Sequence, residues 1–302
     1  MNRRYNRAMS DASCKLYTAT QVRGIDNVAI HELGIAGYEL MCRAGRAVVD
    51  VAIESFPNAG HWLVMCGPGN NGGDGYVVAR LAGEAGIDVS VCSLIDPRQL
   101  KGDAARAYLD WQAGGGEVLN WPMSENNSFD LALDALLGTG IDREVGGEFR
   151  GAIAFFNQLD CPKIAIDIPS GLNADTGCVM GCSVQAQSTV TFVGQKRGMY
   201  TADGPDHCGA ISFDTLAIPA EAASGFDDSA GSLLTVGQLL EISEKRPRNS
   251  HKGHFGHVLA VGGISGMGGA VRLCGEAALR CGAGKVTLAT DPAHAGMVNL
   301  VR

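Results

Sequence analysis

The sequence predicts an α/β fold in which a mostly parallel sheet is covered on both faces by helices. Apolar runs and helical runs alternate from Trp62 to Asp167, an order typical of parallel strands joined by helical crossovers. The 302 residues include 42 glycines, which suits frequent tight turns between strands and helices.

Composition narrows the class of protein. The net charge of −8 argues against nucleic acid as a main partner, and no apolar run is long enough for a membrane span. The ten cysteines are scattered without a C-x-x-C pair, which disfavours a cysteine metal site. The basic start lacks the apolar core of a signal peptide. We therefore expect a cytoplasmic protein with reduced thiols and a disordered leader over residues 1–15.

Two helices are predicted before the alternating core. The first begins at an N-cap threonine, Thr18 or Thr20, and Gly34 ends its apolar stripe. The second covers about residues 37–56, and Pro57 follows it. We interpret both as packing elements, although such a pair is also suited to covering the edge of an active site or to forming a dimer interface.

The core and the domains follow from the same patterns. Strands are predicted over 62–66, 89–95, 117–119, 131–137 and 163–167, helices over 74–86, 102–113 and 148–159, and edge strands over 184–193 and 210–213. The first domain then covers residues 16–219, and the small, polar segment 220–234 is predicted to be a linker. Residues 235–302 contain too few residues to close an independent α/β domain, so we interpret them as the N-terminal fragment of a second domain.

The most informative stretch is Gly67 to Gly75, GPGNNGGDG, between a strand and a helix. Its match to G-x-G-x-x-G is weak alone, but Asn70, Asn71 and Asp74 are unusual in a plain dinucleotide loop. Free amides at the start of the next helix favour an anion. The plainer alternative is a tight turn in which Asp74 complements the helix dipole.

Two further strand ends carry polar groups. Asp134 interrupts an apolar strand, and it is either a structural carboxylate or a ligand for a cation, since burying an unpaired carboxylate is costly. The flexible loop 138–140 that follows it is suited to binding phosphate. Asp167 ends the next strand, where it could act as an acid/base group, hold a ribose hydroxyl or cap the following turn. Ser170 is either an oxygen ligand or a turn residue. Because ligands bind outside the carboxyl ends of parallel strands, we expect these loops to converge on one pocket. Asn, Asp and Ser oxygens there suit a hard cation.

Four segments, GPGNNGGDGYVVAR, DALLGTG, AIDIPSGLNADTG and TVTFVGQKRG, make residues 16–219 resemble the NAD(P)H-hydrate epimerase family. The resemblance implies a three-layer αβα Rossmann-like fold, interconversion of the R and S hydrates of NADH and NADPH, a bound potassium ion and frequent homodimers. Potassium would be held by Asn71, Asp134 and Ser170. The substrate would be held by Asn70, Asn71, Gly72, Gly73, Asp74, Gly138, Thr139, Gly140, Ile141, Asp142, Arg143, Glu144 and Asp167.

We assign the catalytic acid/base role to Asp167, since a partly buried carboxyl can give and regain one proton. The chain departs from the family at Cys42, where a glutamate is usual, at a position to which we assign no catalysis.

The tail, from Asn249, resembles the start of the ADP- or ATP-dependent NAD(P)H-hydrate dehydratase domain. The resemblance implies an incomplete ribokinase-like α/β segment in which Ala270 matches a substrate contact. We expect this segment to be too incomplete for activity in this chain, whereas a longer protein would also be a lyase.

Two other functions remain open. An ordinary Rossmann oxidoreductase would use Asp96 for the ribose hydroxyls, but it leaves NNGGD, DALLGTG and DIPSG unexplained. A non-enzymatic nucleotide-sensing or lipoprotein-binding module is the second, and the presence of Asp134, Asp167 and Ser170 favours an active site over it.

Overall fold

The computed structural model describes residues 14–123, 128–226, 230–241 and 246–298. The chain divides into two compact units, residues 1–234 and 235–302. The assignment of these units to an epimerase and a dehydratase domain stays a proposal.

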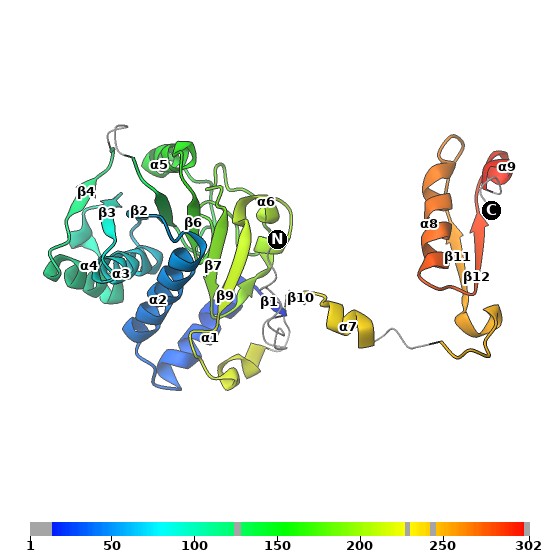
Figure 1. Cartoon of the computed structure of the whole chain (residues 1–302), viewed down its shortest axis with the longest axis horizontal. Helices are drawn as coiled ribbons and strands as arrows, with labels where there is room; N and C mark the ends of the chain where they lie inside the picture. Colours follow the sequence, from blue (N-terminus) through cyan, green and yellow to red (C-terminus); the bar gives the residue numbers. More distant parts are fainter. Residues whose placement is uncertain (1–13, 124–127, 227–229, 242–245, 299–302) are drawn as a thin grey trace. The chain divides into compact units, whose positions relative to one another are not determined.

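The first unit is built on a seven-stranded sheet in the order β4-β3-β2-β5-β6-β7-β9 (Figure 1). Every neighbouring pair is parallel. From β2 the chain moves outward to β3 and β4, then returns to the other side of β2 to form β5. The strand order therefore reverses between β2 and β5, the position where open α/β sheets bind ligands. The strands are β2 (His61–Cys66), β3 (Asp88–Ser93), β4 (Val118–Asn120), β5 (Leu131–Ala135), β6 (Lys163–Ile166), β7 (Ser188–Phe192) and β9 (Ala210–Asp214).

Helices cover both faces of this sheet. On one face, α2 (Gly37–Ser55), α3 (Asn70–Glu84) and α4 (Gly102–Ala113) bury a core that includes Val48 and Trp62. On the other, α5 (Gly147–Gln158) packs Ile153 and Phe156 against Leu63 and Met65. Alternate residues of β2 thus face opposite cores, as the two-residue period of a strand requires. The expected three-layer αβα arrangement is confirmed.

The first helix, α1, is fixed to the rest of the first unit by its N-terminal cap and by the short strand before it. Thr18 caps α1 (Ala19–His31) through a capping box with Gln21, and Asp175 accepts a hydrogen bond from the Ala19 amide at 2.6 Å. Before it, β1 (Lys15–Tyr17) pairs with β8 (Gln195–Lys196). The start of α1 is thereby tied to the loop after β6 and to the strand that follows β7. A 3-10 helix, Arg197–Tyr200, and α6 (Gly204–Cys208) complete this region.

The structure differs from the expected linker and leader. Residues 220–226 form a 3-10 helix whose Ala222 is buried with Val22 and Ile25 of α1, and β10 (Gly231–Ser232) pairs with β1. Although residues 220–234 are mostly small and polar, a few of their apolar side chains pack against α1. At the other end, Cys14 is buried and Lys15 begins β1, while residues 1–13 of the predicted leader lie outside the described residues.

Two boundaries near the site also differ from prediction. The helix expected from Asp74 begins at Asn70, because Gly69 acts as its N-cap and Gly73 donates to the Gly69 carbonyl at 3.1 Å. The strand expected to reach Leu137 ends at Ala135. In consequence, the NNGGD stretch is the first turn of α3, and Leu136 and Leu137 belong to the loop after β5.

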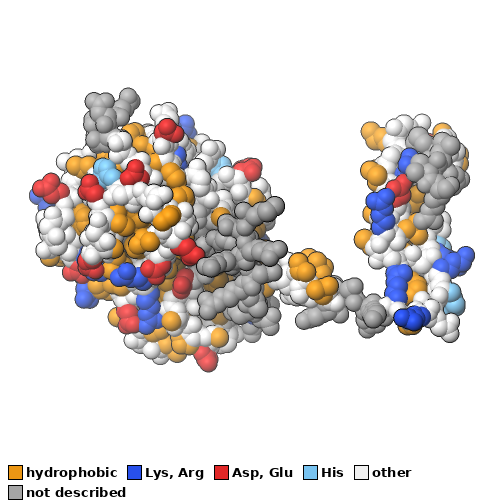
Figure 2. Space-filling model, viewed as in Figure 1, with side chains coloured by type: hydrophobic (Ala, Val, Ile, Leu, Met, Phe, Trp, Pro, Cys, Tyr) orange, Lys and Arg blue, Asp and Glu red, His pale blue; other side chains and the backbone are white. Residues whose placement is uncertain are grey.

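The second unit has two parallel strands, β11 (His257–Val261) and β12 (Lys285–Ala289), joined by α8 (Gly268–Arg280). It also contains α7 (Val236–Glu241), α9 (Ala295–Val298) and two 3-10 helices, Lys252–Phe255 and Pro292–His294. Hydrophobic side chains lie at its surface (Figure 2), among them Leu259, Val261, Ile264, Met267 and Leu273. Within the described residues of the whole chain, every helix is too short or too polar to cross a membrane.

Candidate active site

A cavity of about 840 Å³ opens where the strand order reverses. Its floor comes from the loops after β2, β5 and β6, and its walls include α1 and α2. The N-terminal helix pair, interpreted from sequence as packing, therefore also covers the edge of this cavity. The wall from α1 is one helical face, formed by Val22, Arg23, Asp26, Asn27 and Ile30.

Most glycines of the GPGNNGGDG stretch serve internal packing. A Cβ on Gly67 would lie 1.7 Å from the Leu136 carbonyl oxygen, and one on Gly72 would lie 2.1 Å from the Gly67 carbonyl oxygen. The loops after β2 and β5 therefore touch backbone to backbone. Gly69, by contrast, has open space around its Cβ position and lines the cavity. The start of α3 consequently faces the cavity with free backbone amides, which suits an anionic group.

The structure brings together most, but not all, of the predicted substrate residues. Gly72 and Gly73 are buried and do not line the cavity; Gly73 packs against Met41 and Ala104. Ala270 lies on α8 of the second unit, where its side chain is exposed. The residues that do line the cavity are Asn70, Asn71, Asp74, Gly138, Thr139, Gly140, Ile141, Asp142, Arg143, Glu144 and Asp167.

Asp167 is held in a left-handed backbone conformation, with φ of 68°, directly after β6. This region is unfavourable for most non-glycine residues, by about 1–2 kcal/mol. The Asp167 amide donates to the Val190 carbonyl at 2.8 Å, and its Oδ1 accepts from the Phe192 amide at 3.3 Å. Backbone contacts from β7 thus turn the carboxylate toward the cavity, with 19% of the side chain exposed.

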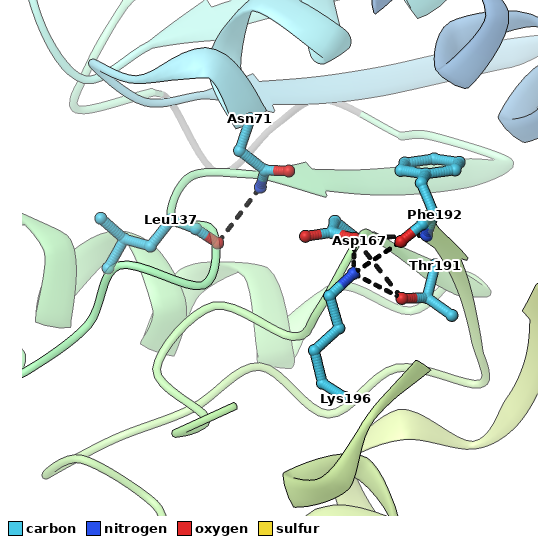
Figure 3. Close-up of polar contacts among 6 residues, drawn as sticks. All are labelled: Asn71, Leu137, Asp167, Thr191, Phe192 and Lys196. Carbon is cyan, nitrogen blue, oxygen red and sulfur yellow. Dashed lines mark hydrogen bonds and ion pairs between the residues drawn. The ribbon is translucent and has the colours of Figure 1, made fainter. Parts of the chain in front are cut away.

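Lys196 forms an ion pair with Asp167 (Figure 3). Its side chain is fully buried, and Nζ also donates to Thr191 Oγ1 at 2.9 Å and to the Phe192 carbonyl at 3.1 Å. All three ammonium hydrogens therefore have acceptors, as a buried charge requires. In this ion pair Asp167 is a carboxylate, which accepts protons and hydrogen bonds.

Sequence reasoning missed two charged residues of the site. Lys196 lay within the quoted TVTFVGQKRG segment, and a lysine in the short segment that follows an apolar strand was the available signal. Asp26 sits among apolar residues of α1, and only its helical spacing from Val22 and Ile30 hinted at a shared face.

Two further carboxyl groups lie close to Asp167. Burial, together with the negative charge of Asp167, raises the pKa of Asp26 to about 6, although Lys196 partly opposes this shift. Burial also raises the pKa of Asp74 well above its ordinary value, with contributions from Asp167 and Asp26. The cavity thus holds one paired carboxylate and two carboxyl groups that resist ionisation.

Beside the cavity, Asp134 is fully buried within β5. Its Oδ1 accepts from Ser170 Oγ at 2.6 Å and from the Leu136 amide at 3.1 Å, and its Oδ2 accepts from the Ser170 amide at 2.7 Å. Burial raises the pKa of Asp134 to about 6, whereas these hydrogen bonds lower it in part. In the part of the chain that the structure describes, the hydrogen-bond donors to this carboxylate are therefore neutral groups.

Asn71 completes an oxygen-rich corner next to Asp134. Its Nδ2 donates to the Leu137 carbonyl at 3.1 Å (Figure 3), and the same carbonyl lies 3.1 Å from Ser170 Oγ. Within the described residues, the buried Asn71 Oδ1 has no hydrogen-bond partner. A buried acceptor without a donor fits a cation, since oxygen atoms are what hard cations prefer. The residues present fit the predicted potassium site.

Asp96, which an ordinary Rossmann oxidoreductase would use for the ribose, is placed elsewhere. It caps a short 3-10 helix, Pro97–Gln99, and forms an ion pair with Arg98 at 2.8 Å. It does not line the cavity, so the geometry gives that reading no support.

Comparisons with known proteins agree with this geometry. The chain is 43% identical over 285 residues to a Coxiella burnetii protein named bifunctional NAD(P)H-hydrate repair enzyme Nnr, which covers 94% of this chain and 58% of that protein. An Escherichia coli protein of the same name is 40% identical, over 91% of this chain and 53% of its own length. The chain thus spans little more than half the length of these relatives.

A solved structure shares the fold. The crystal structure of yeast ynu0, YNL200c, superimposes with a TM-score of 0.61 at 21% identity, covering 74% of this chain and 98% of that one.

The family described as YjeF-related protein N-terminus matches residues 37–198. That span contains the cavity-forming loops after β2, β5 and β6, and it exceeds half of the chain. The chain belongs to the family of YjeF-related protein N-terminal domains.

Proposed function

We propose that the first unit interconverts the R and S hydrates of NADH and NADPH. The observation that carries this proposal is the Asp167–Lys196 ion pair in the cavity, with two carboxyl groups of raised pKa beside it. Epimerisation at the carbon that carries the hydroxyl needs proton transfers to and from the leaving and entering groups, and it needs no redox partner. The names of the bifunctional NAD(P)H-hydrate repair relatives support the same substrate.

The cavity suits a hydrated dinucleotide in size, and the start of α3 suits its diphosphate. Its volume of about 840 Å³ is within the range of ligand pockets. The start of α3 and the Thr139 hydroxyl offer donors for the diphosphate, and Arg143 adds a positive charge at the same cavity. We place the diphosphate near α3 and the altered nicotinamide ring near Asp167.

Asp167 acts as the acid/base group in this proposal. The carbon that carries the hydroxyl also carries the ring nitrogen, so loss of water gives a planar iminium-like ring that water can attack from either face. Alternatively, the ring opens to an aldehyde and recloses. Both routes need a group that gives a proton and later accepts one.

We further propose that potassium is bound by Asn71, Asp134 and Ser170. The unpartnered Asn71 Oδ1 and the buried Asp134 support this ligand set. When bound, the cation would supply positive charge beside the loops after β2 and β5. Its structural effect would be to fix the Asn71 side chain and the Leu137 carbonyl, which border the cavity.

The test uses purified residues 1–302 and separated R and S hydrates of NADH. We expect the two epimers to equilibrate faster than without protein, with no change in the redox state of the nicotinamide. A parallel incubation with NAD and an alcohol library should give no NADH. Epimer exchange at the uncatalysed rate would refute the proposed function.

We propose that the second unit is the N-terminal fragment of the dehydratase domain of a bifunctional repair enzyme. The Coxiella burnetii relative matches over 285 residues, more than the first unit contains. Because α8 and two strands leave Leu259 and Val261 exposed, we expect no ADP-dependent conversion of hydrated NADH to NADH by residues 1–302. Such conversion by the purified chain would contradict this expectation, and limited proteolysis should cut the second unit first.

We also propose a cytoplasmic protein, as its scattered cysteines suggest, and homodimers, as the resemblance to the epimerase family implies. Size-exclusion chromatography with light scattering tests the dimer, and a monomer at micromolar concentration would contradict it.

A further inference from the structure

We propose that Asp26, on α1, is a second catalytic residue and gives the proton to the departing hydroxyl while Asp167 accepts a proton from water. This inference rests on the proposed epimerisation. It divides the acid and base roles between two carboxyl groups that enter the cavity from different elements.

The ion pair with Lys196 limits what Asp167 can do first. Lys196 is fully buried and donates to Asp167, Thr191 and Phe192, so its ammonium cannot be solvated by water instead. Asp167 begins the cycle as a carboxylate and is ready to accept a proton. A different group must therefore supply the first proton.

Asp26 meets the requirements of that donor. It lines the cavity on the same helical face as Val22 and Ile30, and only part of its side chain is exposed. Burial and Asp167 raise its pKa to about 6, close enough to neutral for a proton to be given and regained. Two carboxyl groups whose environments favour opposite protonation states are the usual arrangement for an acid and a base.

The position of Asp26 is fixed by the fold. The capping box at Thr18 and the hydrogen bond from the Ala19 amide to Asp175 anchor the start of α1 two turns before Asp26. Asp175 itself belongs to the segment after β6 that begins with Asp167. One segment therefore sets both the acceptor and the helix that carries the donor.

The balanced step is as follows. The Asp26 carboxyl proton moves to the hydroxyl oxygen, the carbon–oxygen bond breaks, and water leaves as the ring nitrogen lone pair forms the carbon–nitrogen double bond. Water then forms a carbon–oxygen bond on the other face, and its proton moves to the Asp167 carboxylate. Proton exchange with solvent restores the starting state, and the opposite direction runs the same transfers backwards.

Asp74 is the competing donor, since it lines the same cavity and its pKa is also raised. Burial raises the pKa of Asp74 well above its ordinary value, so the Asp74→Asn variant decides whether Asp74, rather than Asp26, supplies the proton. Asp167, Lys196 and Asp74 interact electrostatically with Asp26. The other charged residues that line the same cavity are Arg23, Asp103, Asp142, Arg143 and Glu144.

The test compares Asp26→Asn, Asp74→Asn and the control Glu32→Gln, which removes an exposed charge from the end of α1 outside the cavity. Epimerisation of separated hydrates is followed from pH 5 to 9, with the uncatalysed rate subtracted. We expect Asp26→Asn to lower kcat by roughly 10–10²-fold with little change in KM. Because the donor must be protonated, kcat/KM of the unsubstituted chain should decline above about pH 6, and this decline should disappear in Asp26→Asn.

Three results separate the outcomes. If the unsubstituted chain does not epimerise, the proposed function fails. If it does but Asp26→Asn keeps its kcat and its pH profile, or if Asp74→Asn alone carries the loss, the proposal for Asp26 is overturned. Circular dichroism and ADP-ribose binding identify misfolding, and Asp26→Glu should then recover part of kcat if Asp26 donates the proton.

Discussion

Asp134 and Asp167 lie near the carboxyl ends of neighbouring parallel strands, yet their surroundings are opposite. Asp134 is fully buried in β5, and its hydrogen-bond donors among the described residues are Ser170 and Leu136. Asp167, one strand over and just past β6, faces the cavity and forms an ion pair with Lys196. At the same edge of the sheet, one aspartate therefore receives hydrogen bonds from neutral groups, whereas the other forms an ion pair with a lysine.

The difference follows from a shift of two residues in register, because Asp167 lies two residues beyond Ala165, the partner of Asp134. Asp134 lies opposite Met65 and Ala165 within the sheet ladder, so its side chain has to point into a packed layer. Asp167 follows the last strand residue, Ile166, and its positive φ turns it out of the ladder. A carboxylate inside the ladder needs neutral donors or a cation, whereas one beyond it can meet a substrate.

The largest expected effect comes from Asp167→Asn. The amide keeps hydrogen bonds but cannot cycle a proton, so we expect kcat for epimerisation to fall roughly 10²-fold or more while binding is largely kept. Asp160→Asn, an exposed acid just before β6, serves as the control. If binding weakens and turnover survives, Asp167 only positions the substrate, and Asp142 or Glu144 becomes the next candidate.

Lys196→Met should give the next largest effect, because it keeps the buried stem and removes the charge beside Asp167. We expect a loss of about 10-fold in kcat. The double variant Asp167→Asn/Lys196→Met should be no slower than Asp167→Asn alone, since residues that act as a unit are not additive. Additive losses would mean that Lys196 acts independently of Asp167.

A smaller effect is expected on thermal stability, where the Asp134 and Asp167 variants should differ in how potassium changes their Tm. At a potassium concentration ten times Kd, binding stabilises the folded state by about 1.4 kcal/mol, which raises Tm by a few degrees. Asp134→Ala should lose this response and its potassium-dependent activity, whereas Asp167→Asn should keep the rise in Tm. Sodium chloride at equal ionic strength is the control. Equal Tm and equal activity in potassium-free buffer would refute the ion.

The smallest effect is a pH-dependent gain in stability for Asp26→Asn. The pKa of Asp26 is raised to about 6 in the folded chain, so its ionisation opposes folding. The difference from the unsubstituted chain should be absent below about pH 4, grow between about pH 4 and 6 and stay constant above. A gain of about 1 kcal/mol corresponds to about 2–4 °C in Tm. A variant that is less stable at pH 7 would show that Asp26 is a structural group.

Much of the fold could be predicted because its signals are local. The alternation of apolar strands and helices from Trp62 to Asp167 gave the parallel sheet, and the helices 37–56, 102–113 and 148–159 were placed within a residue or so. The start of α3 was misplaced because asparagine and glycine are poor helix formers, while the Gly69 N-cap and close packing of the glycines override that preference.

The sequence by itself determined the parallel αβα fold, the three strand ends that carry polar residues and the family to which the chain belongs. These follow from periodicity, from glycine and from motif spacing, all of which are read along the chain. Only the tertiary structure decided that Lys196 pairs with Asp167, that Asp26 of α1 enters the same cavity and that Gly72 and Gly73 face away from it. Those contacts join residues far apart in sequence, and burial and charge at the site depend on which elements the fold packs together.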